Sequence, residues 1–504
     1  MEPKNAEILS VVSIRAADVF APTQGVPSWA LMKQAGMGIA DAVEQRWSRR
    51  KTFILCGPGN NGGDGFVAGR LLADAGWPIQ VSLLCNPDAL SGDALKAFKY
   101  WGGPLAQAAG DALADSELII DAMFGAGLTR PLDGSALDLC NAINGSAAPI
   151  VAIDVPSGLD GDRARSDGAV VQADLTVTFH RLKPAHVLEP GAALCGETVL
   201  VDIGIPDGWR EDIDAVGELN GPDLWSNAFT EPDTATHKHR RGRLGVLTGG
   251  PASSGAARMA AQAGLHAGAG LVTLLAPKNA LQVNAMASTE VMVRGFDDVD
   301  AFLRGLDEMR ATAAVVGPGA GVGEETRKRV IAALSRTFPL VLDADALTSF
   351  AGEPEHVFEH LRPGDVLTPH EGEFERLFPE LLDRSLNKFE AAREAARRAG
   401  AVIVLKGADT IVASPDGRAR VNRHAAPVLA TAGSGDVLAG MIGALLAQGH
   451  DVFDAASAAI WLHGDCAIHH GPGLVAGDLI AAIPEALTRL YEQRARGAAL
   501  QRLK

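Results

Sequence analysis

The sequence predicts two fused α/β domains, each with a mostly parallel sheet between layers of helices. Short apolar runs alternate with stretches of helical spacing along both halves of the chain, which is typical of repeated strand–helix units. The length of 504 residues exceeds what a single core usually serves. Between residues 206 and 240 the alternation gives way to Asp, Pro, Gly and Asn, which indicates a boundary. We therefore expect domains over 1–215 and 225–504.

The first half begins with helix and then alternates. Residues 1–50 have helical spacing, most clearly between Ser28 and Trp47. A strand then leads into a glycine-rich loop, and the alternation follows from there. The strands expected in this half are 52–56, 78–84, 117–121, 149–154, 174–179 and 198–202, and the helices after residue 50 are 66–75 and 92–101.

The second half repeats the pattern. Its first strand, 244–248, is followed by the loop Gly249–Gly255 and by a helix through Ala267. The apolar spacing changes between a period of two and a period of 3.6 along the rest of the half. The other strands expected are 271–275, 313–316, 339–342, 365–368 and 401–405, and the other helices are 324–334, 389–399, 437–447 and 453–469.

Composition excludes several classes of function. A formal charge of −16 and an aromatic content of 5 % argue against a nucleic-acid partner. The one basic cluster, residues 237–243, is interpreted as a solvated boundary. No secretory signal precedes the first helix, and no apolar run approaches the ~20 residues of a membrane span. Five scattered cysteines fit a reducing compartment, so we expect a cytoplasmic protein.

Two segments near the end of the second half predict an anion site with a catalytic carboxylate. The strand 401–405 ends in Lys406-Gly-Ala-Asp-Thr410, and Thr431–Gly440 surrounds Asp436 with small residues where a helix begins. Glycines allow a ligand to approach, and the start of a helix directs free N–H groups toward an anion. A carboxylate beside an anion suggests a base for a hydroxyl that attacks phosphorus. The alternative is an ordinary glycine-rich helix start with a favourable early acid.

Three further segments of the second half carry polar residues at strand ends. Gly317–Gly321 predicts a close approach of backbone to a ligand. Asp343 and Asp345 follow a strand and could serve a metal-bound phosphate, or they are solvated turn acids. His370 lies between a strand and a helix, where a histidine is often structural.

The first half has its own cluster of strand-end polar residues. The segment Gly57–Gly65 is rich in Gly and Asn but lacks the GxGxxG spacing of dinucleotide sites. Asp121 and Asp154 each end a strand, at the edge where open α/β sheets bind ligands. Asn61, Asp121 and Ser157 could meet as an all-oxygen site for a hard cation. For each aspartate alone, a structural turn acid is the alternative.

The motifs Leu31–Gly36, Asn60–Gly65, Gly125–Leu128 and Asp154–Gly158 resemble the NAD(P)HX epimerase family over most of residues 1–215. NAD(P)HX is hydrated NAD(P)H. The resemblance implies a Rossmann-like three-layer α/β domain, a potassium ion at Asn61, Asp121 and Ser157, and a pocket that Lys183 lines. Asp154 is the candidate acid or base. The implied substrate contacts are Asn60, Asn61, Gly62, Gly63, Asp64, Gly125, Ala126, Gly127, Leu128, Thr129, Arg130, Pro131 and Asp154.

The five segments of the second half, in their order, resemble the ADP- or ATP-dependent NAD(P)HX dehydratase family, which has a ribokinase-like α/β fold. The resemblance implies that Asp436 deprotonates the ring hydroxyl, which then attacks the terminal phosphoryl group. It also implies Mg²⁺ held with ADP or ATP. One departure is the loop Gly249–Gly255, a residue shorter than the family's usual form. The implied substrate contacts are Ala256, Gly319, His370 and Asp436, and the implied nucleotide contacts are Lys406, Gly407, Ala408, Asp409, Thr410 and Gly435.

Together these resemblances predict a bifunctional enzyme that repairs hydrated nicotinamide nucleotides. It would interconvert the R and S epimers of NADHX and NADPHX and dehydrate the S epimer. A ribokinase-like small-molecule kinase of the hydroxymethylpyrimidine or thiazole type is the alternative. In that case the first domain would only bind a nucleotide or another protein. The sequence leaves the choice between ADP and ATP open, and we expect a homo-oligomer.

Overall fold

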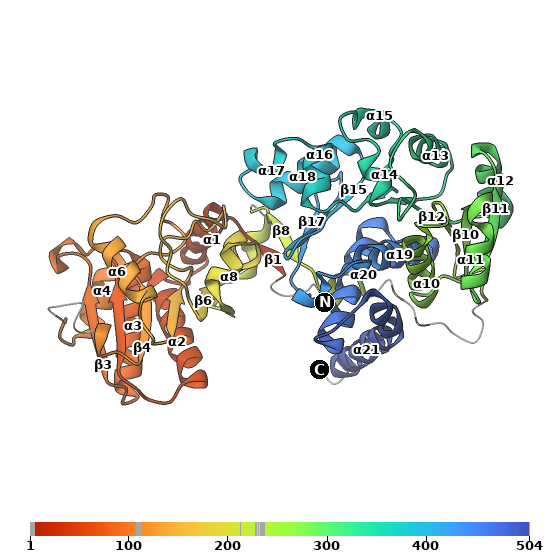
Figure 1. The fold of residues 1–504 in the computed structure, drawn as a ribbon. Helices are drawn as coiled ribbons and strands as arrows, with labels where there is room; N and C mark the ends of the chain where they lie inside the picture. The colour runs from red at the N-terminus through yellow and green to blue at the C-terminus, as the bar shows by residue number, and fades with distance from the viewer. Residues whose placement is uncertain are drawn as a thin grey trace. The chain divides into compact units, whose positions relative to one another are not determined.

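The computed structural model describes residues 6–106, 113–211, 213–226, 229, 231 and 237–502. The chain forms two compact units, an N-terminal unit over Asn5–Glu218 and a C-terminal unit over Leu219–Lys504 (Figure 1). Both are built from a sheet and helices, so the predicted two-domain α/β class is confirmed. Part of the expected boundary stretch, 206–240, lies outside the described residues.

The N-terminal unit is built on a six-stranded, fully parallel sheet in the order β3-β2-β4-β5-β6-β7. Side chains alternate between its faces, as the two-residue period of a strand requires. Ile54 packs on one face and Phe53 and Leu55 pack on the other. The strands are β2 (Thr52–Cys56), β3 (Ile79–Leu83), β4 (Leu118–Ala122), β5 (Ile150–Ile153), β6 (Leu175–Phe179) and β7 (Glu197–Val201).

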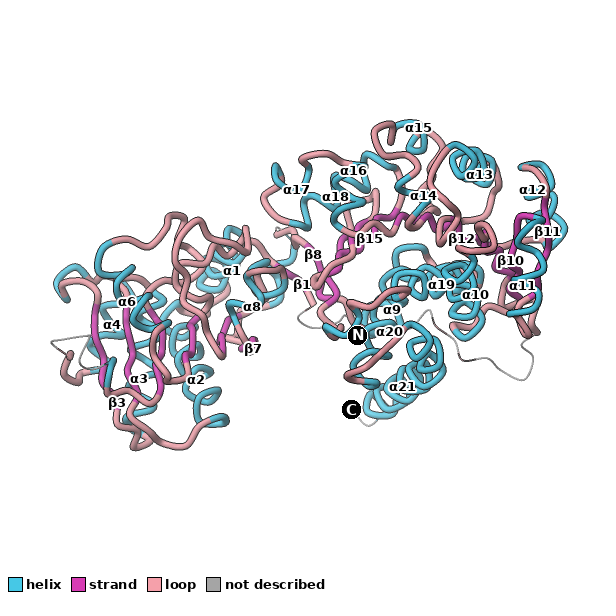
Figure 2. The backbone as a smooth tube through the Cα atoms, viewed as in Figure 1, coloured by secondary structure: helices cyan, strands magenta, loops and turns pink. Residues whose placement is uncertain are grey.

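Helices cover both faces of this sheet, which gives the three layers predicted for the unit (Figure 2). One face packs against α2, α3 and α4, and the other packs against α6. A short antiparallel pair, β1 (Glu7–Ile8) with β8 (Gly217–Leu219), joins the beginning and the end of the unit. The helices are α1 (Val11–Thr23), α2 (Ser28–Arg46), α3 (Asn60–Asp74), α4 (Gly92–Trp101), α6 (Gly134–Asn144), α7 (Pro184–Val187) and α8 (Gly191–Cys195).

The C-terminal unit contains the strand order β17-β16-β15-β14-β13-β12-β9-β10-β11. The strands from β15 to β11 in this order are parallel, whereas β16 and β17 are antiparallel additions at one end. The strands are β9 (Arg243–Leu247), β10 (Leu271–Pro277), β11 (Met292–Phe296), β12 (Ala313–Val316), β13 (Leu340–Leu342), β14 (Val366–Leu367), β15 (Val402–Leu405), β16 (Thr410–Ala413) and β17 (Ala419–Asn422).

Helices also lie on both faces of this sheet. Figure 2 shows α10, α19, α20 and α21 on one side of the strands and α13, α14, α16 and α18 on the other. Nearly all of α19 is buried. The helices are α9 (Pro222–Trp225), α10 (Ser254–His266), α11 (Leu281–Ala287), α12 (Val299–Met309), α13 (Glu324–Leu334), α14 (Asp345–Thr348), α15 (Glu355–Phe358), α16 (Glu371–Leu377), α17 (Leu381–Arg384), α18 (Lys388–Ala399), α19 (Ser434–Ala447), α20 (Val452–His470) and α21 (Ala476–Arg502).

One local expectation was wrong, and some elements were not expected. The segment Gly57–Gly65 was expected to be a loop, but α3 begins within it at Asn60. Its glycines are needed for close packing, because a methyl group built on Gly62 would lie 2.0 Å from the Gly57 carbonyl oxygen. The antiparallel strands β16 and β17 were not expected, and the segment Lys406–Thr410 is therefore the turn that leads into β16.

In the described part of the chain, no helix is long and apolar enough to cross a bilayer.

Candidate active sites

The N-terminal unit has a cavity of about 510 Å³ at the carboxyl ends of its strands. The loops after β2 and β4 line it, and these neighbouring strands are where the strand order reverses. Open α/β sheets bind ligands at such switch points. The predicted residues on the cavity wall are Asn60, Asn61, Asp64, Gly125, Ala126, Gly127, Leu128, Asp154 and Lys183.

The other predicted residues of the N-terminal unit do not line this cavity. Gly62 and Gly63 are buried inside the first turns of α3, and a methyl group on Gly63 would meet the Met32 side chain at 2.6 Å. Thr129, Arg130 and Pro131 are exposed. Arg130 pairs with Asp133 at 2.8 Å. These residues therefore support the loop ends and do not form the wall.

Asp154 and Lys183 form a buried ion pair in the cavity. Lys183 is 2 % exposed, and its Nζ lies 2.8 Å from Asp154 Oδ1. Lys183 Nζ also donates to Thr178 Oγ1 at 3.1 Å, and the Ala126 N–H donates to Asp154 Oδ2 at 2.9 Å. Burial opposes ionisation, but the Lys183 charge and these donors outweigh it and lower the pKa of Asp154. Asp154 is therefore a carboxylate at neutral pH.

The backbone around Asp154 is held in an unusual conformation. Asp154 has φ of +68°, which costs free energy for a residue with a side chain. The Lys183 N–H donates to His186 Nδ1 at 2.9 Å, so the proton of the ring is on Nε2. That Nε2–H donates to the Asp154 carbonyl at 2.7 Å. Burial and the neighbouring Lys183 lower the pKa of His186 to about 4, and it stays neutral. The neutral ring fixes the Asp154 backbone without competing for its carboxylate.

A second carboxylate, Asp121, is fully buried beside Ser157. Ser157 donates its hydroxyl to Asp121 Oδ1 at 2.7 Å and its N–H to Oδ2 at 2.8 Å. Burial nevertheless raises the pKa of Asp121 to about 6 against these hydrogen bonds. Asn61 lies close to Asp154, since a methyl group on Gly125 would be 2.9 Å from Asn61 Oδ1 and 2.8 Å from Asp154 Oδ2. Asn61 Nδ2 is buried without a hydrogen-bond partner.

Two further acids face the same cavity. Desolvation on the cavity wall raises the pKa of Asp18 to about 6. The charge of Lys183 lowers this pKa, and the charge of Asp154 raises it further. Burial, together with the charges of Asp154 and Asp18, raises the pKa of Asp64 well above its usual value. The cavity thus combines one ionised carboxylate with carboxyls that retain their protons more readily. Such a set can both accept and donate protons.

In the C-terminal unit, glycine loops after β9 and β12 meet at the point where the strand order reverses. A methyl group on Gly249 would lie 1.8 Å from the Gly319 carbonyl oxygen, and one on Gly317 would lie 1.7 Å from that of Asp343. Gly319 has φ of +63°, and a methyl group there would lie 3.4 Å from Ala256 Cβ. The structure thus brings the predicted residues Ala256 and Gly319 together.

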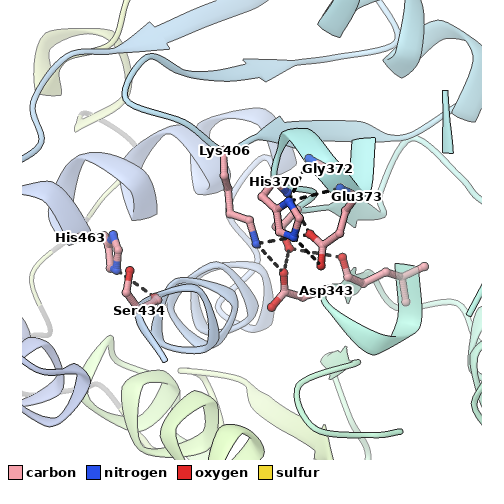
Figure 3. Close-up of polar contacts among 9 residues, drawn as sticks. Asp343, His370, Gly372, Glu373, Lys406, Ser434 and His463 are labelled. Carbon is pink, nitrogen blue, oxygen red and sulfur yellow. Dashed lines mark hydrogen bonds and ion pairs between the residues drawn. The ribbon is translucent and has the colours of Figure 1, made fainter. Parts of the chain in front are cut away.

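A network of charged residues lies beside these loops (Figure 3). Lys406 Nζ is 2.9 Å from Oδ1 of the buried Asp343, which also accepts from the Thr368 hydroxyl at 2.7 Å. Glu373 Oε2 lies 4.0 Å from the same ammonium. His370 caps α16, because its Nδ1 accepts backbone N–H groups at 3.0 and 3.2 Å. His370 is thus fixed by the helix start, with its ring still half exposed.

Asp436 lies in the first turn of α19, after the left-handed Gly433. Burial raises the pKa of Asp436 to about 6. The negative charges of Asp343 and Asp345 raise it as well, whereas the positive charge of Lys406 lowers it. A methyl group on Gly435 would be 3.5 Å from Lys406 Nζ. The lysine therefore connects the Asp343 carboxylate with the start of α19. A poised carboxylate, a helix N-terminus and an ammonium group suit a proton transfer next to a phosphoryl group.

The turn Lys406–Thr410 is held by its own residues and by α18. Gly407 donates its N–H to Thr410 Oγ1 at 3.1 Å, and the hydroxyl donates back to the Gly407 carbonyl at 2.8 Å. Asp409 is buried and pairs with Lys388 at 2.5 Å. Ala408 is exposed at the tip. The predicted nucleotide residues thus form one rigid turn whose exposed edge is Gly407–Ala408.

Sequence reasoning missed several residues of both sites. Arg15 and Asp18 come from α1, and His180 lines the cavity with φ of +63° and a buried Nε2 that has no hydrogen-bond partner. Glu373 and Lys388 join the second network. The sequence carries no pattern that would place Arg15 and Asp18 at this cavity. Within the described ranges, no three His, Cys, Asp or Glu side chains gather in a way that could hold a metal ion.

Two family models match separate parts of the chain. Residues 28–185 match the model described as the YjeF-related protein N-terminus. Residues 244–485 match the model described as NAD(P)H-hydrate dehydratase. Each match falls within one of the two units and includes most of the residues described above.

Curated relatives match nearly the whole chain. The bifunctional NAD(P)H-hydrate repair enzyme Nnr of Moorella thermoacetica is 36 % identical over 93 % of this chain and 94 % of its own. The enzyme of the same name from Thermofilum pendens is 34 % identical over 94 % of each chain. Among solved structures, the ADP/ATP-dependent NAD(P)H-hydrate dehydratase of Bacillus subtilis, co-crystallised with ATP/Mg²⁺, is 29 % identical. It covers 52 % of this chain and 94 % of its own, with a TM-score of 0.44.

Proposed function

The chain belongs to the family of bifunctional NAD(P)H-hydrate repair enzymes, and we propose how its two units divide the two reactions. The N-terminal domain, 1–215, interconverts the R and S epimers of NADHX and NADPHX. The C-terminal domain, 225–504, dehydrates the S epimer to NAD(P)H at the expense of ADP or ATP. The division follows the two family matches, one in each unit.

For the epimerase, Asp154 is the proposed catalytic acid–base. The observation that carries this assignment is its buried pairing with Lys183 at 2.8 Å inside the cavity, which keeps it ionised. Epimerisation requires the bond between the hydroxyl-bearing ring carbon and a neighbouring atom to break and re-form, with a proton transferred each way. Asp154 can take the hydroxyl proton and return it. The other substrate contacts proposed are those on the cavity wall, Asn60, Asn61, Asp64 and Gly125–Leu128, with Gly62, Gly63, Thr129, Arg130 and Pro131 supporting them.

The proposed potassium site consists of Asn61, Asp121 and Ser157. The residues fit such an ion in two respects. They offer only amide, carboxylate and hydroxyl oxygens, which hard cations prefer. Asn61 Nδ2 is buried without a hydrogen-bond partner. Rotating the amide by 180° would place its oxygen where this nitrogen now lies. When bound, the ion would supply a fixed positive charge beside the buried Asp121.

For the dehydratase, Asp436 is the proposed base. It takes the proton of the ring hydroxyl as that oxygen forms a bond to the terminal phosphorus, and the bond from phosphorus to the nucleotide breaks. Release of AMP from ADP, or of ADP from ATP, leaves a phosphate ester on the ring. Loss of inorganic phosphate and of the neighbouring ring proton restores the reduced nicotinamide. The raised pKa of Asp436, about 6, supports its role as a base near neutral pH.

The remaining dehydratase residues are assigned by position. Ala256, Gly319 and His370 are the proposed contacts of the hydrated nicotinamide nucleotide, together with Asp436. The turn formed by Lys406, Gly407, Ala408, Asp409 and Thr410, with Gly435, is the proposed nucleotide site. N–H groups at Gly433–Gly435 would stabilise the developing charge. Mg²⁺ would be held mainly by the nucleotide phosphates and would neutralise part of their charge, with the buried Asp343 as the nearest carboxylate to Lys406.

We also propose a cytoplasmic, homo-oligomeric enzyme. All five cysteines are free thiols, as expected in a reducing compartment. Large α/β enzymes commonly assemble symmetrically, and size-exclusion chromatography with light scattering tests this directly.

The deciding experiment follows NADH absorbance in a mixture of NADHX epimers with Mg²⁺, K⁺ and either ADP or ATP. We expect full recovery with the intact protein, recovery of only the S fraction with Asp154→Asn, and no recovery with Asp436→Asn. Spontaneous epimerisation is subtracted with a blank. Absence of recovery from the intact protein with both nucleotides would refute the proposal and favour a small-molecule kinase.

A further inference from the structure

Helix α1 forms one wall of the N-terminal cavity. Val11, Ile14, Arg15 and Asp18 line the cavity, and their spacing places all four on one face of the helix. The adjoining side of the helix is anchored, because Ala17 and Ala21 are buried in a cluster with Leu31, Ala35, Ile203, Ile205 and Trp209. The matched family segment begins at residue 28, so this wall lies outside it.

The start of α1 is fixed close to the catalytic residues. Ser10 caps the helix by accepting the Ser13 N–H at 3.0 Å. The Val11 N–H donates to Asp162 Oδ1 at 2.8 Å, and the Leu9 N–H donates to the Leu182 carbonyl at 2.9 Å. Leu182 precedes Lys183, so α1 is tied to the segment that carries the partner of Asp154. The position of Arg15 relative to the cavity is therefore determined by the fold.

The Arg15 guanidinium rests on the glycine loop that borders the cavity. A methyl group built on Gly127 would lie 2.5 Å from Arg15 Nη2. Arg15 and Lys183 are the cations among the residues that line this cavity. Lys183 is paired with Asp154, whereas Arg15 forms no ion pair with a residue that the structure describes. Burial raises the pKa of Asp162, and the Arg15 charge makes a minor contribution that lowers it. The cavity thus has one guanidinium without an ion pair, among the carboxyls Asp18, Asp64, Asp93 and Asp154.

We propose that Arg15 binds the pyrophosphate of the hydrated dinucleotide when the nicotinamide ring lies at Asp154. This assignment rests on the proposed epimerase function of the unit. A dianionic group in a cavity that also holds the ionised Asp154 is stabilised by a cation, and arginine matches phosphate with two parallel N–H groups. The guanidinium and the glycine loop would hold the phosphates while Asp154 acts on the ring.

The spacing favours the pyrophosphate over the adenosine 2′-phosphate of NADPHX. A methyl group on Gly125 would lie 2.8 Å from Asp154 Oδ2, and one on Gly127 would lie 2.5 Å from Arg15 Nη2. Two residues span at most about 7 Å, so Arg15 and Asp154 border the same short loop. In the substrate, one ribose separates the nicotinamide ring from the pyrophosphate, and the 2′-phosphate lies beyond a second ribose. Arg15 should therefore serve NADHX and NADPHX equally.

The test measures conversion of the purified R epimer to the S epimer by chromatography, without ADP or ATP, so that the dehydratase consumes nothing. For Arg15→Gln we expect KM to rise about 10- to 100-fold, as for a lost charged hydrogen bond. The value of kcat should stay within about twofold, because the contact is equally strong in the ground and transition states. Arg15→Lys keeps the positive charge but loses the two parallel N–H groups, so its KM should lie between those of the unaltered protein and Arg15→Gln.

Two controls separate the possible outcomes. Arg70→Gln removes an exposed arginine on α3 that pairs with Asp74, and it should leave KM unchanged. Dehydration of the S epimer by Arg15→Gln, with ADP or ATP added, should equal that of the unaltered protein. An unchanged epimerase KM for Arg15→Gln would overturn the assignment, and so would a rise confined to NADPHX, which would indicate the 2′-phosphate. If the unaltered protein does not epimerise, the proposed function itself fails.

Discussion

Replacing Lys183 with methionine should destabilise the N-terminal unit and reverse the pH dependence of its stability. The ammonium lies 2.8 Å from a carboxylate that is 18 % exposed. At an effective dielectric constant of about 20, this separation corresponds to a gross attraction of about 6 kcal/mol. Removing one partner of a buried pair typically costs about 3–5 kcal/mol. Because Asp154 retains some solvent, we expect about 3 kcal/mol.

For a unit of about 200 residues, this loss corresponds to a fall in Tm of roughly 6–12 °C. Differential scanning calorimetry of the full chain can assign the shifted transition, because the two units are expected to unfold separately. Lys51→Met, which breaks the exposed pair with Asp115, is the matched control and should change little.

The pH dependence gives the sharper test. With Lys183 present, the pKa of Asp154 lies below its unfolded value near 3.8. The pair therefore contributes stability above about pH 4 and loses it as pH falls through the folded pKa. In Lys183→Met, burial is left largely unopposed, so the pKa of Asp154 should rise above 3.8 and stability should decline as pH increases from about 4. A variant that kept the original slope and lost less than about 1 kcal/mol would refute the ion-pair argument.

Three changes in the C-terminal unit give further tests. Asp436→Asn should stabilise this unit by roughly 1–3 kcal/mol at pH 7 and hardly at pH 4, because the folded pKa of about 6 lies some two units above the unfolded value and solvent screens part of the effect. Urea melts at both pH values measure this. Lys406→Met should lower the free energy of unfolding by about 3 kcal/mol, because it leaves Asp343 buried and unpaired. Lys278→Met removes an exposed ion pair and should change stability little, and thermal melts compare the two variants. Gly317→Ala should lower the free energy of unfolding by about 3 kcal/mol or more, because the φ of this residue is +131° and the new methyl group would collide with the Asp343 carbonyl. A soluble variant with an unchanged Tm would contradict this.

Most strands and many candidate site positions follow from the sequence because parallel strands align their carboxyl ends. Asp121 and Asp154 each follow an apolar run, and the topology places both strand ends at one edge of the sheet. Gly319 and Ala256 were assigned to one site by the family resemblance, and the structure brings them close together, since a methyl group on Gly319 would lie 3.4 Å from Ala256 Cβ.

Contacts that depend on tertiary packing could not be predicted in this way. The glycines after β2 have low helix propensity, yet α3 begins at Asn60 because glycine alone fits against the neighbouring backbone and Met32. No sequence pattern indicates that α1 reaches the cavity with Arg15 and Asp18. His370 looks like a candidate ligand residue, and its structural role as a helix cap appears only when Nδ1 is seen to accept two N–H groups.

The pairing of β1 with β8 has a consequence for how the N-terminal unit can be rearranged. Glu7 lies opposite Glu218, so the chain enters and leaves the unit at adjacent positions. Joining these ends by a short linker would need no change in the parallel sheet, and new termini could be opened at the exposed end of α6, near Gly145. A circular permutant of this kind would keep the N-terminal cavity intact, because the residues that line it lie between the two ends of the unit. The N-terminal unit thus begins and ends in one two-stranded antiparallel pair, β1 with β8.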